Sequence, residues 1–137
     1  MAKTYTAPFA QTINNSNCVL TTAGTVNSDI PTNAVLLYTA GADGSIITTI
    51  EAMPRATVTA TALYLFSSTD GGTTKRLIDC VLMAAYTFAL TTQTPQTVFT
   101  NYSEDYPLRL GSGETLYAST GVSLASGIVV EARGMNL

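Results

Sequence analysis

The chain has 137 residues with a net charge of −3, and it contains no histidine and no tryptophan. This length fits one domain that can bury a sizeable core without a disulfide or metal scaffold. The acidic balance argues against a nucleic-acid-binding protein and against docking on a membrane with anionic lipid. Without histidine, the Ser-His-Asp and Cys-His catalytic arrangements and most zinc and iron sites are excluded. We therefore expect a protein that is not an enzyme and has no cofactor and no metal.

The amino-acid usage favours strands and self-association. Threonine fills 24 positions, and this β-branched residue suits pleated, half-exposed surfaces. Charged residues make up 11% of the chain, against about 25% in a typical soluble domain. Surface charges help to keep soluble proteins apart. Because this chain has few of them, we expect neighbouring subunits to cover much of its surface. The alternative is a monomer whose hydroxyl groups are solvated.

The N-terminal part is polar and lacks the apolar core of a signal peptide, which predicts synthesis and residence in a cytoplasm-like compartment. Residues 1–17 show little periodicity, and we interpret them as an extended arm that is ordered on a neighbouring subunit. Residues 81–90 form the longest nearly apolar run, which is too short to span a bilayer.

From Cys18 onward, apolar runs alternate with clusters of Gly, Pro, Asn and Asp, as in an all-β sandwich or barrel. An Asp-Gly turn within residues 40–44 predicts a hairpin, and Pro54 ends the strand after it. Strands are predicted at residues 18–26, 35–39, 45–53, 56–67, 74–83, 96–100, 108–110, 114–124 and 128–133.

The strand at residues 56–67 is the clearest by alternation, and residues 67–73 form the hairpin turn after it. The side chains expected on one face are Val58, Ala60, Ala62, Tyr64 and Phe66. The other face begins with threonines and turns apolar at Leu63 and Leu65, so this half of the strand is expected to be buried on both faces. Residues 81–90 fit either a strand or the start of a short helix. The whole pattern predicts one antiparallel β-sandwich at residues 18–137, jelly-roll-like and with about eight strands, preceded by the arm at residues 1–17.

The acidic residues form no recognisable catalytic pair. Glu104 and Asp105 are adjacent, so on a strand they face opposite sides. Asp43 and Asp70 each precede glycine and are better explained as turn residues than as calcium ligands.

Aromatic side chains are the candidates for an interface, because tyrosine combines an apolar ring with a hydroxyl group that can find a partner. The candidates are Tyr5, Phe9, Tyr102, Tyr106 and Tyr117. The same tyrosines could form a sugar-stacking platform, or they could be partly buried on strand faces.

Cys18 and Cys80 are the only cysteines, and their spacing matches no metal or redox motif. Three states remain open for them: two reduced buried thiols, a bridge within the chain, or a bridge between subunits.

Two segments carry a resemblance to a known class of proteins. They are residues 56–76, a strand that runs into the turn Ser-Ser-Thr-Asp-Gly-Gly-Thr, and residues 106–117, Tyr-Pro-Leu-Arg-Leu-Gly-Ser-Gly-Glu-Thr-Leu-Tyr. In their pattern of strands and turns, residues 18–137 resemble the small β-sandwich structural proteins of tailed bacteriophages, above all the decoration or cement proteins that coat capsids. The resemblance implies a trimer on a capsid lattice, arms that bind neighbouring capsomers, and no catalytic residues. Many such proteins carry more charge than this chain.

We therefore expect a virion structural protein on the outer capsid surface that binds itself and the major capsid protein or another virion protein. Cys18 and Cys80 are then candidates for a disulfide between subunits, formed after release to an oxidising exterior. One alternative is a carbohydrate- or receptor-binding module, and another is a tail, neck or spike component.

Overall fold

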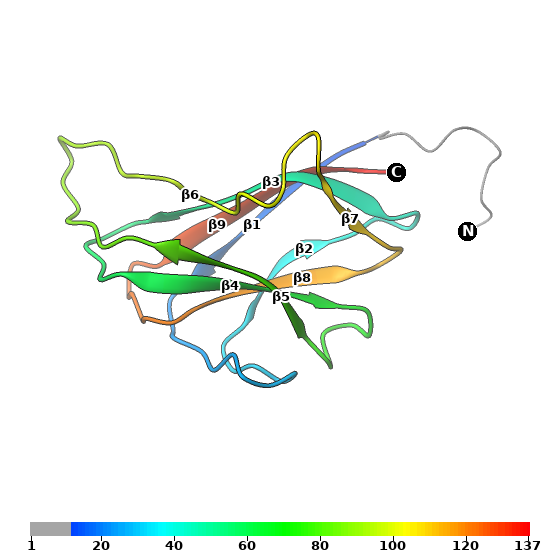
Figure 1. Ribbon diagram of the computed structural model, residues 1–137, viewed down its shortest axis with the longest axis horizontal. Coiled ribbons are helices and arrows are strands. Elements are labelled where there is room, and N and C mark those ends of the chain that lie inside the picture. Colours follow the sequence, from blue (N-terminus) through cyan, green and yellow to red (C-terminus); the bar gives the residue numbers. More distant parts are fainter. Residues whose placement is uncertain (1–11) are drawn as a thin grey trace.

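The computed structural model describes residues 12–137, which form two antiparallel β-sheets packed face to face (Figure 1). Within this range there are nine strands and no helix, so the helical alternative for residues 81–90 is wrong. The strands are β1 (Thr12–Leu20), β2 (Val35–Thr39), β3 (Ser45–Pro54), β4 (Thr61–Ser68), β5 (Arg76–Met83), β6 (Thr97–Val98), β7 (Leu108–Leu110), β8 (Thr115–Thr120) and β9 (Ile128–Asn136). The prediction of an all-β, antiparallel two-sheet architecture is confirmed.

The strands alternate between the sheets along most of the chain. One sheet is five-stranded in the order β1-β9-β3-β6, with β7 also paired to β3, and the other is four-stranded in the order β2-β8-β4-β5. Strands far apart in sequence therefore become neighbours, and β9 pairs over its whole length with both β1 and β3.

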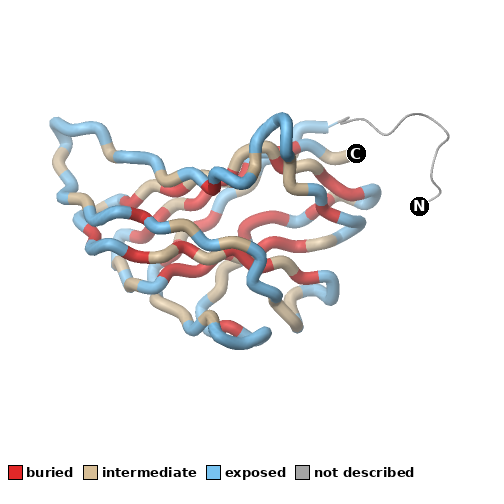
Figure 2. The backbone as a smooth tube through the Cα atoms, in the orientation of Figure 1, coloured by how far each residue is buried: buried red, intermediate tan, exposed pale blue. Residues whose placement is uncertain are grey.

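The core lies between the sheets, where the inward-facing side chains of both layers meet (Figure 2). The five-stranded sheet contributes Cys18, Leu20, Ile50, Ala52, Ile128, Val130 and Ala132, and the four-stranded sheet contributes Leu37, Leu63, Leu65, Met83, Leu116 and Ala118. Inward positions pair across strands, as in Cys18 with Val130. Since alternate residues of a strand face opposite sides, this pairing sets the face of every neighbour along the strand.

Strand β1 begins at Thr12, so residues 12–17, which we expected in the arm, belong to the sheet. Their backbone pairs with β9, and their polar side chains bond to it as well. The Asn14 side-chain amide donates to Asn136 Oδ1 at 2.9 Å, and Asn15 Oδ1 accepts from the Gly134 N–H at 3.1 Å. Residues 1–11, with Tyr5 and Phe9, lie outside the described residues.

The strand predicted at residues 56–67 is shorter than expected, but its alternation is as predicted, with Leu63 and Leu65 on one face and Tyr64 and Phe66 on the other. The strand begins at Thr61, and Leu63 and Leu65, not Tyr64, face the core. Val58 precedes the strand and makes an isolated bridge with Tyr86. The sequence predicted that the half of the strand with Leu63 and Leu65 is buried on both faces, and Phe66 on the opposite face is indeed buried.

Phe66 is fully buried yet does not belong to the core between the sheets. It pairs with Tyr117 of β8 and therefore lies on the outer face of the four-stranded sheet. On the same face Ser119 is buried too. Something other than the second sheet must therefore cover this outer face.

The connection between β1 and β2, residues 21–34, provides that cover. At one end the Gly24 N–H donates to the Thr120 carbonyl of β8 at 3.1 Å. Further on, the Asp29 carbonyl accepts from the Lys75 N–H at 2.8 Å, and the Asp29 carboxylate pairs with Arg76 of β5 at 3.0 Å. Since β4 lies between β8 and β5, the connection crosses β4 and encloses Phe66.

We predict that Gly24→Ala weakens the packing of residues 21–34 across β4. An added Cβ would collide with the Thr32 carbonyl oxygen and lie 2.6 Å from Ser119 Oγ. We expect a loss of about 1–3 kcal/mol in the free energy of unfolding, measured by urea denaturation. Gly111→Ala is the control, since its nearest contact is Glu114 Oε1 at 3.7 Å, and it should change stability by less than about 0.5 kcal/mol. Equal effects of the two substitutions would contradict the docking of residues 21–34.

Candidate interaction surface

The predicted interface aromatics do not gather on one surface. Tyr106 is 78% exposed in the loop between β6 and β7. Tyr102 of the same loop is half-buried and packs against the core. Burial and the nearby negative charge of Asp79 raise the pKa of the Tyr102 phenol to about 12, so it stays protonated at neutral pH. Of this pair, only Tyr106 is presented to a partner.

This loop borders a hollow of about 320 Å³. The residues that line it are Asn101, Tyr102, Asp105, Tyr106, Pro107, Leu108 and Arg109. Behind it, the Asn101 side-chain amide donates to Asp79 Oδ1 at 3.2 Å, while Asp79 Oδ2 is buried and unpartnered. The hollow therefore combines an exposed aromatic ring with polar groups of both signs.

Tyr117 is engaged within its own subunit. The Lys75 ammonium group lies over its ring, 4.8 Å from the ring centre, and donates to the Gly72 carbonyl at 2.6 Å. Such a cation–π contact fixes the lysine and the hairpin turn to the outer face of β8. Tyr117 thus holds the β4–β5 hairpin in place.

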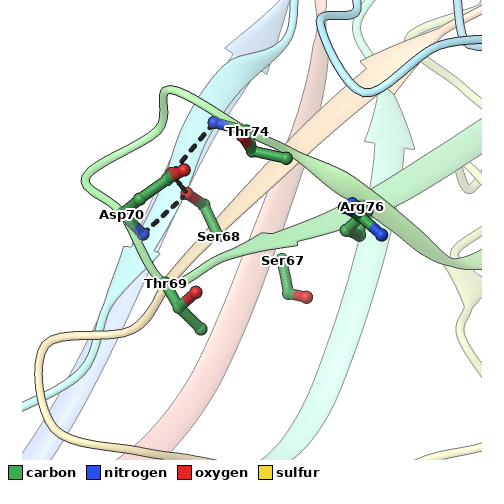
Figure 3. A pocket seen from close by; sticks show the side chains of 6 residues that line it. All are labelled: Ser67, Ser68, Thr69, Asp70, Thr74 and Arg76. Carbon is green, nitrogen blue, oxygen red and sulfur yellow. Dashed lines mark hydrogen bonds between the residues drawn. The ribbon is translucent and has the colours of Figure 1, made fainter.

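The β4–β5 turn forms a second hollow, of about 260 Å³, whose polar groups are largely satisfied by one another (Figure 3). Asp70 Oδ1 accepts from the Ser68 hydroxyl at 2.8 Å and from the Thr74 N–H at 2.9 Å. These bonds favour the ionised carboxylate and lower the Asp70 pKa to about 2, the Thr74 N–H contributing most. The arrangement explains the turn and leaves Asp70 little capacity for a ligand.

Both cysteines are free thiols in this chain, in different surroundings. Cys18 faces the core and is 7% exposed, and burial raises the pKa of its thiol to about 12. Cys18 lies inside β1, and its burial opposes a disulfide to another subunit. Cys80 lies on β5 and is exposed.

Sequence reasoning missed an apolar surface on β5 and the connection that follows it, which we call the apolar edge. Its large exposed side chains are Leu77, Ile78, Leu82, Phe88 and Leu90. Leu82 is 69% exposed and Leu90 is 93% exposed. The sequence does carry one signal for it, since no charged residue stands between Asp79 and Glu104.

The outer face of the five-stranded sheet carries charged side chains. Glu51 of β3 and Glu131 of β9 are direct cross-strand neighbours, an arrangement that alone would be repulsive. Arg133 lies between them, 2.8 Å from Glu131 and 3.5 Å from Glu51. The charges of this face are therefore matched within the chain, while the cross-strand pair Ile13 and Met135 adds exposed apolar side chains near one end of it.

Comparisons with known protein families, curated proteins and solved structures give no match for this chain. Over residues 12–137, no group of three or more acidic, cysteine or histidine side chains is arranged to hold a metal ion. In the same range no helix is long and apolar enough to cross a membrane.

We predict that a maleimide labels only Cys80 in the folded protein. The buried thiol of Cys18 is neither accessible nor ionised at neutral pH, since its pKa is about 12. Intact-mass measurement should give one adduct in buffer and two in urea, and Cys80→Ser should give none until it is unfolded. Rapid double labelling of the native protein would contradict the placement of Cys18.

We also predict that Asp70 contributes to stability in a defined pH range. Its folded-state pKa of about 2 lies below its ordinary value of 3.8, so its contribution is present above pH 3.8 and is lost as the pH falls toward 2. Urea unfolding from pH 6 to pH 2 should show a stability deficit of Asp70→Ala that shrinks over this range. Asp43→Ala, in another exposed turn, is the control. A deficit independent of pH would contradict the role of the carboxylate.

Proposed function

We propose that this protein is a non-enzymatic virion structural protein that self-associates and reinforces a capsid shell, as a decoration or cement protein does. Its partners would be copies of itself and the major capsid protein or another virion protein. It would be made in the host cytoplasm and reside on the outer capsid surface. A trimer is the assembly that the sequence resemblance implies.

The strand order supports this proposal. β6 and β7 both pair with β3, so they can be counted as one interrupted strand. Residues 12–137 then form eight strands in two four-stranded layers, and successive strands alternate between the layers except at β4 and β5. We propose that this is the jelly-roll order, which is common in viral capsid proteins and in lectin domains.

The observation that carries the proposal is the apolar edge. Large exposed apolar surfaces on soluble proteins usually mark interaction sites. Here one continuous part of the chain holds five large exposed apolar side chains, with no charge among the last three. Each contact between copies can be weak, because repetition over a lattice adds avidity.

A second candidate function is carbohydrate or receptor binding at the hollow formed by residues 101–109. The exposed ring of Tyr106 supports it, because an aromatic face stacks on the apolar face of a sugar ring. Asn101, Asp105 and Arg109 would supply hydrogen bonds to hydroxyl groups. Binding to a glycan array that is abolished by Tyr106→Ala would favour this function.

We predict that the purified protein is larger than one chain in solution. Light scattering over a range of concentrations, with and without reductant, measures the native mass. We expect the same assembly in both buffers, since Cys18 is buried. A monomer at every concentration would overturn the self-association.

The virion location is tested separately. An antibody raised against the protein should label the outer surface of phage particles that are produced by the strain encoding it. Purified particles that lack the protein, or that carry it only on the tail, would overturn the capsid assignment.

A further inference from the structure

Strand β5 is an edge strand with one free side. In the four-stranded sheet it pairs with β4, and no other strand of the described range pairs with it. Figure 1 shows β5 next to β4, with the long connection to β6 leaving from its end. Edge strands of soluble proteins are usually protected by charges, proline or a covering segment. Those protections are confined to one end of β5.

That end is the start of the strand. Here Arg76 pairs with Asp29, and residues 21–34 end their crossing of the sheet. Beyond Asp79 the strand has no charged residue, and none of the connection up to Ser103 is charged. The uncovered remainder presents Leu82, 69% exposed, on the same side as Cys80, and Leu90 follows at 93%.

Asp79 bears on the kind of contact this edge can make. Its carboxylate Oδ1 accepts from the Cys80 N–H at 2.8 Å, so that amide already has a partner within the chain. A continuous hydrogen-bonded ladder with a further strand would have to displace this bond. Packing of apolar side chains would leave it intact.

We propose that a second copy of this chain docks on the apolar edge, across a twofold axis that passes beside β5. This inference rests on the self-association proposed above, names its surface, and gives it twofold symmetry in place of the trimer that the resemblance implies. The two β5 strands run antiparallel, and Leu82 and its apolar neighbours pack against those of the other copy. An isologous contact of this kind uses one patch twice and closes as a dimer.

The charge distribution favours a second copy as the occupant. A partner that is recognised by charge would find no counter-charge along residues 80–103. Along residues 80–103 two copies meet without like charges facing each other, and Asp79, the charge nearest the axis, is half-buried with its Oδ2 enclosed in its own chain. The antiparallel arrangement also places the Arg76 side chains at opposite ends of the contact, because β5 spans residues 76–83 and a strand rises about 3.3 Å per residue.

The experiment compares two substitutions of equally exposed residues. Leu82→Glu puts a charge in the proposed contact, and Ile30→Glu, at a residue 72% exposed on the β1–β2 connection, is the matched control. Analytical ultracentrifugation of the full chain should give a dimer for the wild type and for Ile30→Glu. Leu82→Glu should raise the dissociation constant at least about tenfold. Continued protection of Cys18 from maleimide checks that each variant is folded.

Cross-linking through Cys80 tests the geometry of the proposed dimer directly. A short bis-maleimide should join two chains through Cys80 in the wild type and in Ile30→Glu, because the axis brings these two exposed thiols together. Cys80→Ser should abolish the cross-link without changing the mass found by ultracentrifugation. Leu82→Glu should lower its yield at the same protein concentration.

Each other outcome has a definite meaning. An assembly that Leu82→Glu leaves intact, or a dimer without a Cys80 cross-link, overturns this inference and leaves the proposed self-association standing. A wild-type monomer at all concentrations overturns both. Equal disruption by Leu82→Glu and Ile30→Glu would also overturn it, since the effect would then be one of added charge.

Discussion

The packing of the two sheets through one layer of apolar side chains is the interaction on which the other features depend. β9 is central to it, because it pairs with β1 and β3 and sends Ile128, Val130 and Ala132 into the core. Once that face is buried, the alternation of strands places the intervening residues outside. The same constraint buries Cys18 opposite Val130 and leaves the outer face of β4 to be covered by something else.

The sequence pattern predicts the fold class and most strands because apolar alternation and turn residues are local signals. β2 was predicted with its observed bounds, and β3 and β9 begin where expected. The errors occur where tertiary structure outweighs the local signal. Asn14 and Asn15 hide a strand whose stability comes from pairing with β9, and Phe66 is buried by a connection that lies far away in sequence.

The candidate site was harder to predict, because exposure at an edge is a property of strand order and not of composition. Leu77 and Leu82 look like core residues in the sequence. They pair with Phe66 and Ala62 on the outer face of the four-stranded sheet, at its margin, where no segment of the described residues buries them. Tyr117 was expected at an interface, yet Lys75 lies over its ring and so links this β8 residue to the β4–β5 turn. An aromatic residue that was predicted at an interface therefore stabilises a turn, and leucines that resemble core residues form the exposed candidate surface.

The surfaces of the sandwich differ in what they leave for a partner. On the five-stranded sheet, Arg133 neutralises two neighbouring carboxylates. On the four-stranded sheet, residues 21–34 cover the outer face as far as Arg76. The apolar edge lies just beyond this covered area. Pairing of the few charges within the chain and the cover over the outer face reduce indiscriminate association, and burial of this edge would then join copies in one defined orientation.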